Sequence, residues 1–205
     1  MKTTKFLICA ISIAAALASA KASGQSLPAT LIEISPALLV NGTVNDGGYT
    51  GDYYTGLMRF DGFDAFCVEP TESLSYGESL VYEVQDIGLL SNANAVARLV
   101  SAYLASPQTA DHAAAVQWAI WELTTESLSG PSLVDGNVRI TIPANEPTAT
   151  LANQYLANAG NFAPANLVYL TNNGRQDVVR WTLIPEPATA ALAALSALLL
   201  VRRRR

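Results

Sequence analysis

Apolar and polar residues alternate in short runs through the first half of the chain, a pattern typical of half-buried β-strands. Gly, Asn and Asp separate these runs and favour turns between them. The pattern predicts strands over residues 29–35, 37–44, 53–60 and 64–70. The pair Asp61-Gly62, between the last two runs, is a strong signal for a two-residue hairpin. Alternation after that turn places Cys67 on the same face of its strand as Ala65 and Phe63.

Apolar residues at helical spacing dominate the middle of the chain. They predict helices over residues 92–105 and 110–125, separated by the helix-breaking Pro107. A third helix is expected near residues 148–158, where Gly160 stops it. Strand patterns occur at residues 137–142, 166–171 and 176–184. We therefore predict an α+β fold, a mostly antiparallel β-sandwich or barrel-like domain with a small helical insert.

The N-terminus carries a pattern for export. Two lysines precede an apolar run over residues 6–17, and small residues suited to cleavage follow at residues 18–20. We expect residues 1–22 to be a signal peptide and residues 23–183 to form the exported passenger domain, which is long enough for one hydrophobic core. One of the two cysteines of the chain lies within the signal, so Cys67 is the only cysteine of the passenger domain.

The C-terminus carries a second targeting pattern over residues 184–205. The motif Pro185, Glu186, Pro187 leads into a short apolar stretch that ends in four arginines. This stretch is shorter than the roughly 20 residues of a typical membrane span, but terminal arginines can reach the cytoplasmic interface. The segment resembles the PEP-CTERM sorting signal of Gram-negative bacteria. The resemblance implies a transmembrane helix, transient anchoring in the inner membrane, processing by an exosortase-type enzyme, and delivery to the cell surface or extracellular matrix.

The charge of the passenger excludes some classes of function. Residues 22–184 hold five arginines, no lysine and sixteen acidic residues, a formal charge of −11. So acidic a domain is not expected to bind nucleic acid, which calls for basic patches. His112 is the only histidine of the chain, so the sequence offers little for a metal site. We expect neither a metal nor a cofactor.

Two residues stand out as candidates for chemistry. Cys67 lies in the run FDAFCVEP, on a predicted strand, and Gln117 lies in AVQWAIWEL, on a predicted helix. Helical spacing places Gln117 on one face with Ala113 and Trp121, four residues to either side. For a lone glutamine, the ordinary interpretation is a core residue with satisfied hydrogen bonds.

The two runs together resemble the thioester domain of bacterial surface adhesins. In that family a cysteine after an aromatic residue is joined to a glutamine that opens a helix in a Thr-Gln-x-Ala motif followed by Ile-Trp. The matching positions of this chain are Cys67, Phe66 before it, Gln117, and then Ala119, Ile120 and Trp121. Val116 stands where the family has threonine. The resemblance implies an internal thioester between Cys67 and Gln117.

Such a bond forms when a cysteine thiolate attacks the glutamine carbonyl and expels ammonia, which requires the fold to hold the two groups together. An amine can then open the thioester, forming an amide to Gln117 and freeing the thiol. This is a single covalent capture, so we do not expect an enzyme. The sequence hypothesis is an exported protein that attaches covalently to amine-bearing surfaces or matrix components, as in adhesion.

Other residues could support this chemistry. Phe66, Trp118 and Trp121 are the candidates to shield a thioester from water. Glu69 and Glu122 flank the two runs and could polarise the amide or orient an amine, although solvated surface carboxylates are their ordinary role.

Alternatives for Cys67 remain open from the sequence. It could be a buried structural cysteine, or form an intermolecular disulfide. A Cys/His hydrolase would need His112 beside it. The alternative function is therefore a non-reactive structural protein of the extracellular matrix or exopolysaccharide, with Cys67 as a core residue.

Overall fold

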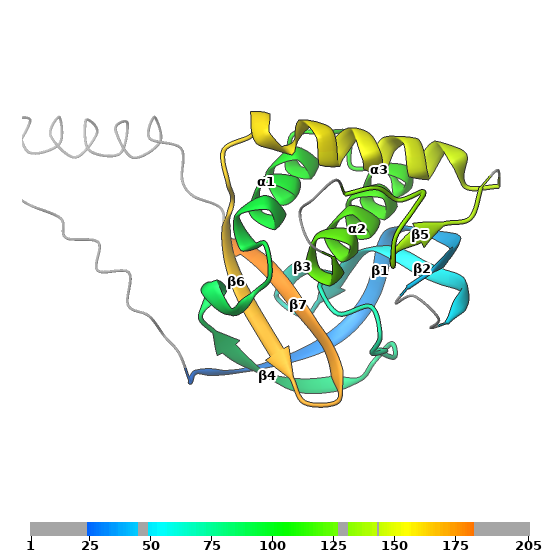
Figure 1. The fold of residues 1–205 in the computed structure, drawn as a ribbon. Coiled ribbons are helices and arrows are strands. Elements are labelled where there is room, and N and C mark those ends of the chain that lie inside the picture. The colour runs from blue at the N-terminus through cyan, green and yellow to red at the C-terminus, as the bar shows by residue number, and fades with distance from the viewer. Residues whose placement is uncertain (1–23, 45–48, 127–130, 143, 183–205) are drawn as a thin grey trace, which may run out of the picture.

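The computed structural model describes residues 24–44, 49–126, 131–142 and 144–182. Over these residues the chain forms a large antiparallel sheet and three α-helices, which confirms the predicted α+β class (Figure 1). The signal peptide predicted for residues 1–22 and the sorting signal with its transmembrane helix, predicted for residues 184–205, lie outside the described residues. Among the helices that are described, none is long and apolar enough to cross a membrane.

The sheet of the described residues closes on itself. Its strands are β1 (Ser26–Thr43), β2 (Thr50–Phe60), β3 (Phe63–Cys67), β4 (Ser79–Gln85), β5 (Arg139–Ile140), β6 (Asn166–Asn172) and β7 (Arg175–Thr182). They are hydrogen-bonded in the order β2-β3-β7-β6-β4-β1-β5, and every pair is antiparallel. Because β1 also pairs with β2, all these strands except β5 form a closed ring.

Strand β1 closes the ring because it is long and changes partner along its length. Residues 26–30 pair with β4, and residues 31–43 pair with β2. The pairing of β1 with β2 has register shifts on either side of Ile34, which allow the strand to bend there. The sequence pattern predicted two strands, broken at Pro36, and that detail is wrong because the chain continues through Pro36 as one strand.

Two further strand predictions need correction. Strand β4 was not predicted, although its residues SLVYEVQ alternate and its Tyr82 is fully buried. The strand predicted over residues 137–142 shrinks to the two residues of β5, which pair only with the end of β1.

The helices follow the sequence prediction closely. They are α1 (Ala93–Leu104), α2 (Ala110–Thr125) and α3 (Glu146–Asn158), with short 3₁₀ turns at Ile87–Leu89 and Ala159–Asn161. The N-terminus of α2 is fixed by Thr109, whose hydroxyl accepts a hydrogen bond from the backbone N–H of His112. Helix α2 contacts β1, β2 and β3 of the sheet as well as α1 and α3, so it lies between the sheet and the outer helices (Figure 1).

Helix α2 is buried around its whole circumference. Every residue from 113 to 123 is buried, including those of the face that carries Gln117. Alanines at 113–115 and 119 let the neighbouring elements approach closely, whereas Trp118 fills the space toward β1. A helix apolar on all sides is the form expected for an element inside a core, so the fold places Gln117 near the centre of the molecule.

The predicted hairpin between β2 and β3 is confirmed. Phe60 and Phe63 lie opposite each other across Asp61-Gly62, and Gly62 has a φ of +123°, a region that favours glycine. Strand β3 continues from this turn between β2 and β7 and ends at Cys67. The hairpin thereby brings the cysteine to the interior of the sheet, under α2.

We predict that Gly42→Ala destabilises the fold. A Cβ at this buried position of β1 would meet the backbone oxygen of Arg139 and the ring of Trp118 well inside van der Waals distance. Overpacking of this kind costs about 1–3 kcal/mol, measurable by urea unfolding. Gly160→Ala is the control, because its Cβ would have no heavy atom within 4 Å. Equal stability of the two variants would contradict the packing described for Trp118.

Candidate functional site

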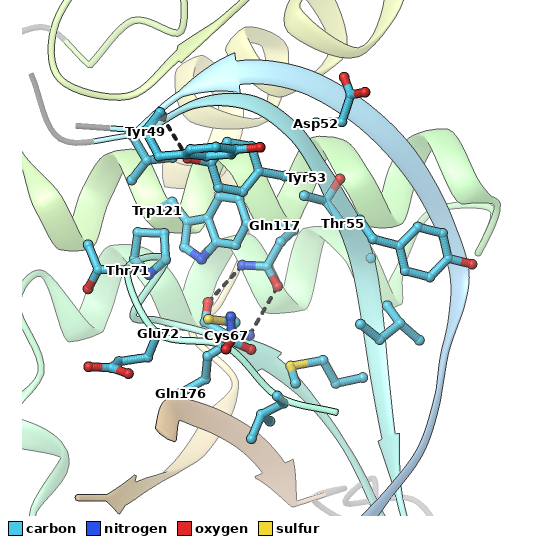
Figure 2. A pocket seen from close by; sticks show the side chains of 18 of the residues that line it. Tyr49, Asp52, Tyr53, Thr55, Cys67, Thr71, Glu72, Gln117, Trp121 and Gln176 are labelled. Carbon is cyan, nitrogen blue, oxygen red and sulfur yellow. Dashed lines mark hydrogen bonds between the residues drawn. The ribbon is translucent and has the colours of Figure 1, made fainter. Parts of the chain in front are cut away.

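The structure brings Cys67 and Gln117 into direct contact. The side-chain Nε2 of Gln117 donates to the backbone oxygen of Cys67 at 2.7 Å, and the backbone N–H of Cys67 donates to Gln117 Oε1 at 3.0 Å (Figure 2). Both residues are buried, with exposed fractions of 2% for Cys67 and 1% for Gln117. Two residues 50 positions apart in the sequence are therefore joined by a reciprocal pair of hydrogen bonds.

The end of the β2–β3 pairing explains why Cys67 can accept this partner. The backbone N–H of Val68 donates to Asp177 of β7, so the neighbouring Cys67 turns its own N–H and C=O the other way, toward β2. The β2–β3 register ends at Met58 opposite Ala65, two residues before Cys67. The amide of Gln117 takes the place of a strand neighbour there and satisfies backbone groups that would otherwise be buried without partners.

The Cys67 thiol is held in its protonated form. Its Sγ donates to the backbone oxygen of Glu69 at 3.3 Å. Burial raises the pKa of Cys67 to about 12, and the Trp121 side chain and the Glu69 backbone lower it only in part. A thiol of this kind is a weak nucleophile at neutral pH, so any reaction there depends on proximity and on local stabilisation of the thiolate.

A cavity of about 610 Å³ opens beside the pair. Trp121 and Tyr53 lie along it, and the mostly exposed tyrosines 49, 54 and 76 border it (Figure 2). Further lining residues include Asp52, Thr71, Glu72 and Gln176. The cavity gives a small molecule a route to the cysteine and glutamine, past a predominantly aromatic wall.

Tyr53 and Trp121 form this aromatic wall, Trp118 packs behind it, and the three rings contact one another edge to face. Tyr53 lies 5.5 Å from Trp118 and 5.8 Å from Trp121 between ring centroids, and the two tryptophans are 5.3 Å apart. The indole Nε1 of Trp121 is buried and has no hydrogen-bond partner within the described structure. Tyr53 was missed in the sequence, since nothing in the alternation of its strand sets it apart from other half-buried tyrosines.

The residues predicted to shield the site take different places. Trp121 lines the cavity with Cys67 and Gln117. Phe66 does not: it packs against Tyr103 and Trp181, with ring centroids 5.1 Å and 5.9 Å away. Trp118 supports Tyr53 from behind. Ala119 and Ile120 are fully buried and do not line the cavity, so their positions serve packing of α2.

The two flanking glutamates also lie apart from the cavity. The prediction of a solvated surface carboxylate is wrong for Glu122, which is 1% exposed and accepts a hydrogen bond from the backbone N–H of Ser132 at 2.7 Å. Its Oε2 has no partner in the described structure, and burial raises its pKa to about 7. Glu69 is half-buried beside Asp177, and burial followed by that charge raises its pKa. Through its backbone oxygen alone, Glu69 contacts the thiol.

The structure does not place His112 beside Cys67, as a Cys/His hydrolase would require. The ring Nδ1 of His112 lies 2.5 Å from the hydroxyl of Tyr155 on α3, and no hydrogen bond joins it to Cys67 among the described residues. The burial of Cys67 disfavours an intermolecular disulfide. Within the described ranges, no group of three or more His, Cys, Asp or Glu side chains could hold a metal ion.

Comparison with known proteins identifies no relative. No protein-family model matches the chain, and no curated protein or solved structure is significantly similar to it. The resemblances to a thioester domain and to a PEP-CTERM signal therefore rest on the motifs alone.

We predict that Glu122→Gln changes the pH dependence of stability. Burial raises the pKa of Glu122 from 4.5 to about 7, so the folded state favours the protonated carboxyl. The stability that this carboxyl contributes is fully present below pH 4.5 and is lost as the pH rises through 7. The variant keeps an acceptor for Ser132 and avoids the buried charge. At pH 8 it should be more stable than the parent by about 2–3 kcal/mol, and at pH 4 equally stable.

The measurement is urea unfolding of both proteins across this pH range. Glu83→Gln, at an exposed carboxylate on β4, provides the matched control for the same chemical change outside the core. An identical profile for Glu122→Gln and its parent would show that the carboxyl is solvated after all.

Proposed function

We propose that the protein forms an internal thioester between Cys67 and Gln117 and uses it to attach covalently to an amine-bearing target. The observation that carries the proposal is the reciprocal hydrogen bonding of the Gln117 amide to the Cys67 backbone, at 2.7 and 3.0 Å. It fixes the amide carbon beside the residue whose side chain carries the thiol. Confinement of this kind can supply effective concentrations on the order of 10⁵ M or more, which offsets the scarcity of thiolate.

The chemistry balances without a further reactant. The thiol proton and the amide nitrogen leave as ammonia when Sγ bonds the Gln117 carbonyl carbon. In the second step a primary amine bonds that carbon, the carbon–sulfur bond breaks, and the sulfur regains a proton from the amine. The products are an amide at Gln117 and a free Cys67 thiol, so each molecule reacts once.

The surroundings suit a stored acyl donor. Trp121 and Tyr53 border the approach to the pair, which limits the access of water, while the cavity of about 610 Å³ admits a small amine or a side chain that ends in one. The passenger domain carries a formal charge of −11 and no lysine. A negative domain attracts a protonated amine toward its surface, and without lysine side chains it cannot acylate itself through them.

The place of action follows from the two ends of the chain. An N-terminal signal peptide at residues 1–22 and the sorting signal at residues 184–205 favour export, transient anchoring in the inner membrane and processing by an exosortase-type enzyme. The proposed destination is the cell surface or extracellular matrix, where the amine-bearing partner would be met. The proposed role is adhesion or covalent incorporation into the matrix.

One observation favours a second function, that of a non-reactive structural protein of the matrix. Gln117 satisfies both backbone groups of Cys67, and the thiol is buried and protonated at neutral pH. These are also properties of an ordinary core pair, in which the amide replaces a missing strand neighbour. The two functions differ in whether a covalent bond forms.

Mass spectrometry of the intact purified protein tests the proposal. The thioester form should weigh one ammonia less than its sequence mass, and Cys67 should resist alkylation while folded. Addition of methylamine should raise the mass by one methylamine, with the adduct on Gln117 and Cys67 newly alkylatable. The sequence mass in fresh protein, with unmodified glutamine at position 117, would exclude a thioester and leave the structural function.

Cys67→Ala and Gln117→Ala are the reactive-site controls, and both should abolish the ammonia loss and methylamine uptake. They should differ in stability. Cys67→Ala keeps the backbone that pairs with Gln117, whereas Gln117→Ala leaves a buried N–H and C=O without partners, a loss of about 1–3 kcal/mol. His112→Ala should leave amine uptake intact, because its ring partner is Tyr155.

We also predict that the surface form of the protein lacks both ends. Material released from the producing cells should begin after the signal peptide and end before the four terminal arginines. Glu186→Ala, within the Pro-Glu-Pro motif, should retain the uncleaved chain in the membrane fraction, as measured by mass spectrometry of each fraction. Recovery of full-length, membrane-bound chain alone from cells that make the unaltered protein would argue against exosortase sorting.

A further inference from the structure

The indole N–H of Trp121 is a buried donor without an acceptor. Trp121 is 4% exposed, and its Nε1 makes no hydrogen bond in the described structure. Its ring lines the cavity together with Cys67 and Gln117, and its nitrogen lies on the side of the ring that faces them (Figure 2). Buried polar groups are nearly always paired in native proteins, so an unpaired donor beside a thiol calls for an explanation.

Helix geometry places the Trp121 indole N–H beside the side-chain amide of Gln117. Trp121 follows Gln117 by four residues, so the two side chains lie next to each other on one face of α2. The helix is buried on all sides and cannot turn relative to β3 without opening the core. The donor and the amide carbon are thus both fixed with respect to Cys67.

The thiol has a hydrogen-bond acceptor in this structure, whereas a thiolate needs hydrogen-bond donors to offset its burial. Sγ donates its proton to the backbone oxygen of Glu69 at 3.3 Å. Once the proton is lost, this hydrogen bond is lost too, and the Glu69 backbone offsets only part of the effect of burial on the pKa of Cys67. A group that could replace the lost hydrogen bond is the unpaired N–H of Trp121.

We propose that Trp121 is the residue that stabilises negative charge on Cys67 Sγ, by donating its indole N–H when the thiolate forms and when it leaves. Its role in turnover rests on the proposed thioester, but its effect on the thiol does not. The Trp121 side chain already lowers the pKa of Cys67 against the larger effect of burial, which agrees with this role.

The charge arises at a defined point in each step. During thioester formation, sulfur attacks as thiolate after its proton has moved toward the departing amide nitrogen. During capture, the amine bonds the Gln117 carbon, the electron pair of the broken carbon–sulfur bond stays on Sγ, and a proton from the amine then restores the thiol. Trp121 keeps its own proton throughout.

Trp118 provides a matched control for this donor. It lies on the same helix, is fully buried, and also has an Nε1 without a partner, but it does not line the cavity. Trp118→Phe and Trp121→Phe are thus the same chemical change in the same packing cluster. Only the second removes a donor beside the sulfur.

The first test uses a chain that cannot form a thioester. In full-length protein carrying Gln117→Ala and Cys9→Ser, iodoacetamide can alkylate Cys67 alone, and the rate reports the thiolate population. Adding Trp121→Phe should slow alkylation about tenfold, because a hydrogen bond to a charged group is lost. Adding Trp118→Phe should change the rate little. If Trp121 merely covers the sulfur, its smaller replacement should speed alkylation, and that result would overturn the proposal.

The second test uses the reactive chain and the rate of methylamine uptake. Trp121→Phe should slow uptake by a similar factor, because thiolate is the leaving group, whereas loss of a simple cover should accelerate uptake and hydrolysis. Slower alkylation in a protein that never loses ammonia would support the role of Trp121 and reject the thioester. A normal ammonia deficit with unchanged or faster rates would reject the role of Trp121 alone.

Circular dichroism and urea unfolding establish first that both tryptophan variants fold. If Trp121→Phe does not, the indole N–H resonance of Trp121 in the Gln117→Ala chain supplies the measurement. It should move as rising pH ionises Cys67, and it should stay fixed when Cys67→Ala is added. A resonance that behaves alike in both chains would overturn the proposal.

Discussion

Two hydrogen bonds between the Gln117 amide and the Cys67 backbone connect the helical layer to the sheet within the buried core. Strand β3 loses its neighbour on the β2 side two residues before it ends, and the glutamine supplies the missing donor and acceptor. Since a buried backbone group without a partner is costly, the position of α2 over β3 is set by this pair. The cavity, the aromatic wall and the contact of Trp121 with the site all follow from that position.

The same arrangement contains a tension between stability and reactivity. Burial that makes the pair rigid also raises the pKa of Cys67 and keeps it protonated. A reactive pair at this depth needs a route for ligand and a means to tolerate charge. The cavity gives the first, and the unpaired indole of Trp121 lies where the second is required. A purely structural core pair would need neither.

Local signals in the sequence predicted part of the fold. Helix α2 begins where expected because Pro107 interrupts the helical pattern before it, and the β2–β3 hairpin follows from Asp61-Gly62. The predicted division of β1 at Pro36 is wrong because the pairing with β2 continues on both sides of this residue, at Ile34 and at Ala37. Closure of the sheet depends on pairings between distant strands, which local alternation does not encode.

The candidate site likewise contains residues that the sequence predicted and residues that it did not. Cys67 and Gln117 were found because unusual residue types stand in short motifs. The burial of Glu122 was not, since it depends on a loop at Ser132 that returns over the helix from further along the chain. Tyr53 and the cavity arise where β2 leaves β3, a tertiary feature without a local sequence pattern.

The complete burial of α2 has a mechanical consequence. A load applied at Gln117 would act on a helix enclosed by β1, β2 and β3 on one side and by α1 and α3 on the other. Pulling that helix out would expose the whole core at once, whereas a residue on an edge strand could be peeled away one hydrogen bond at a time. If Gln117 carries the proposed covalent link, its interior position makes that link resistant to force, because every layer of the domain shares the load.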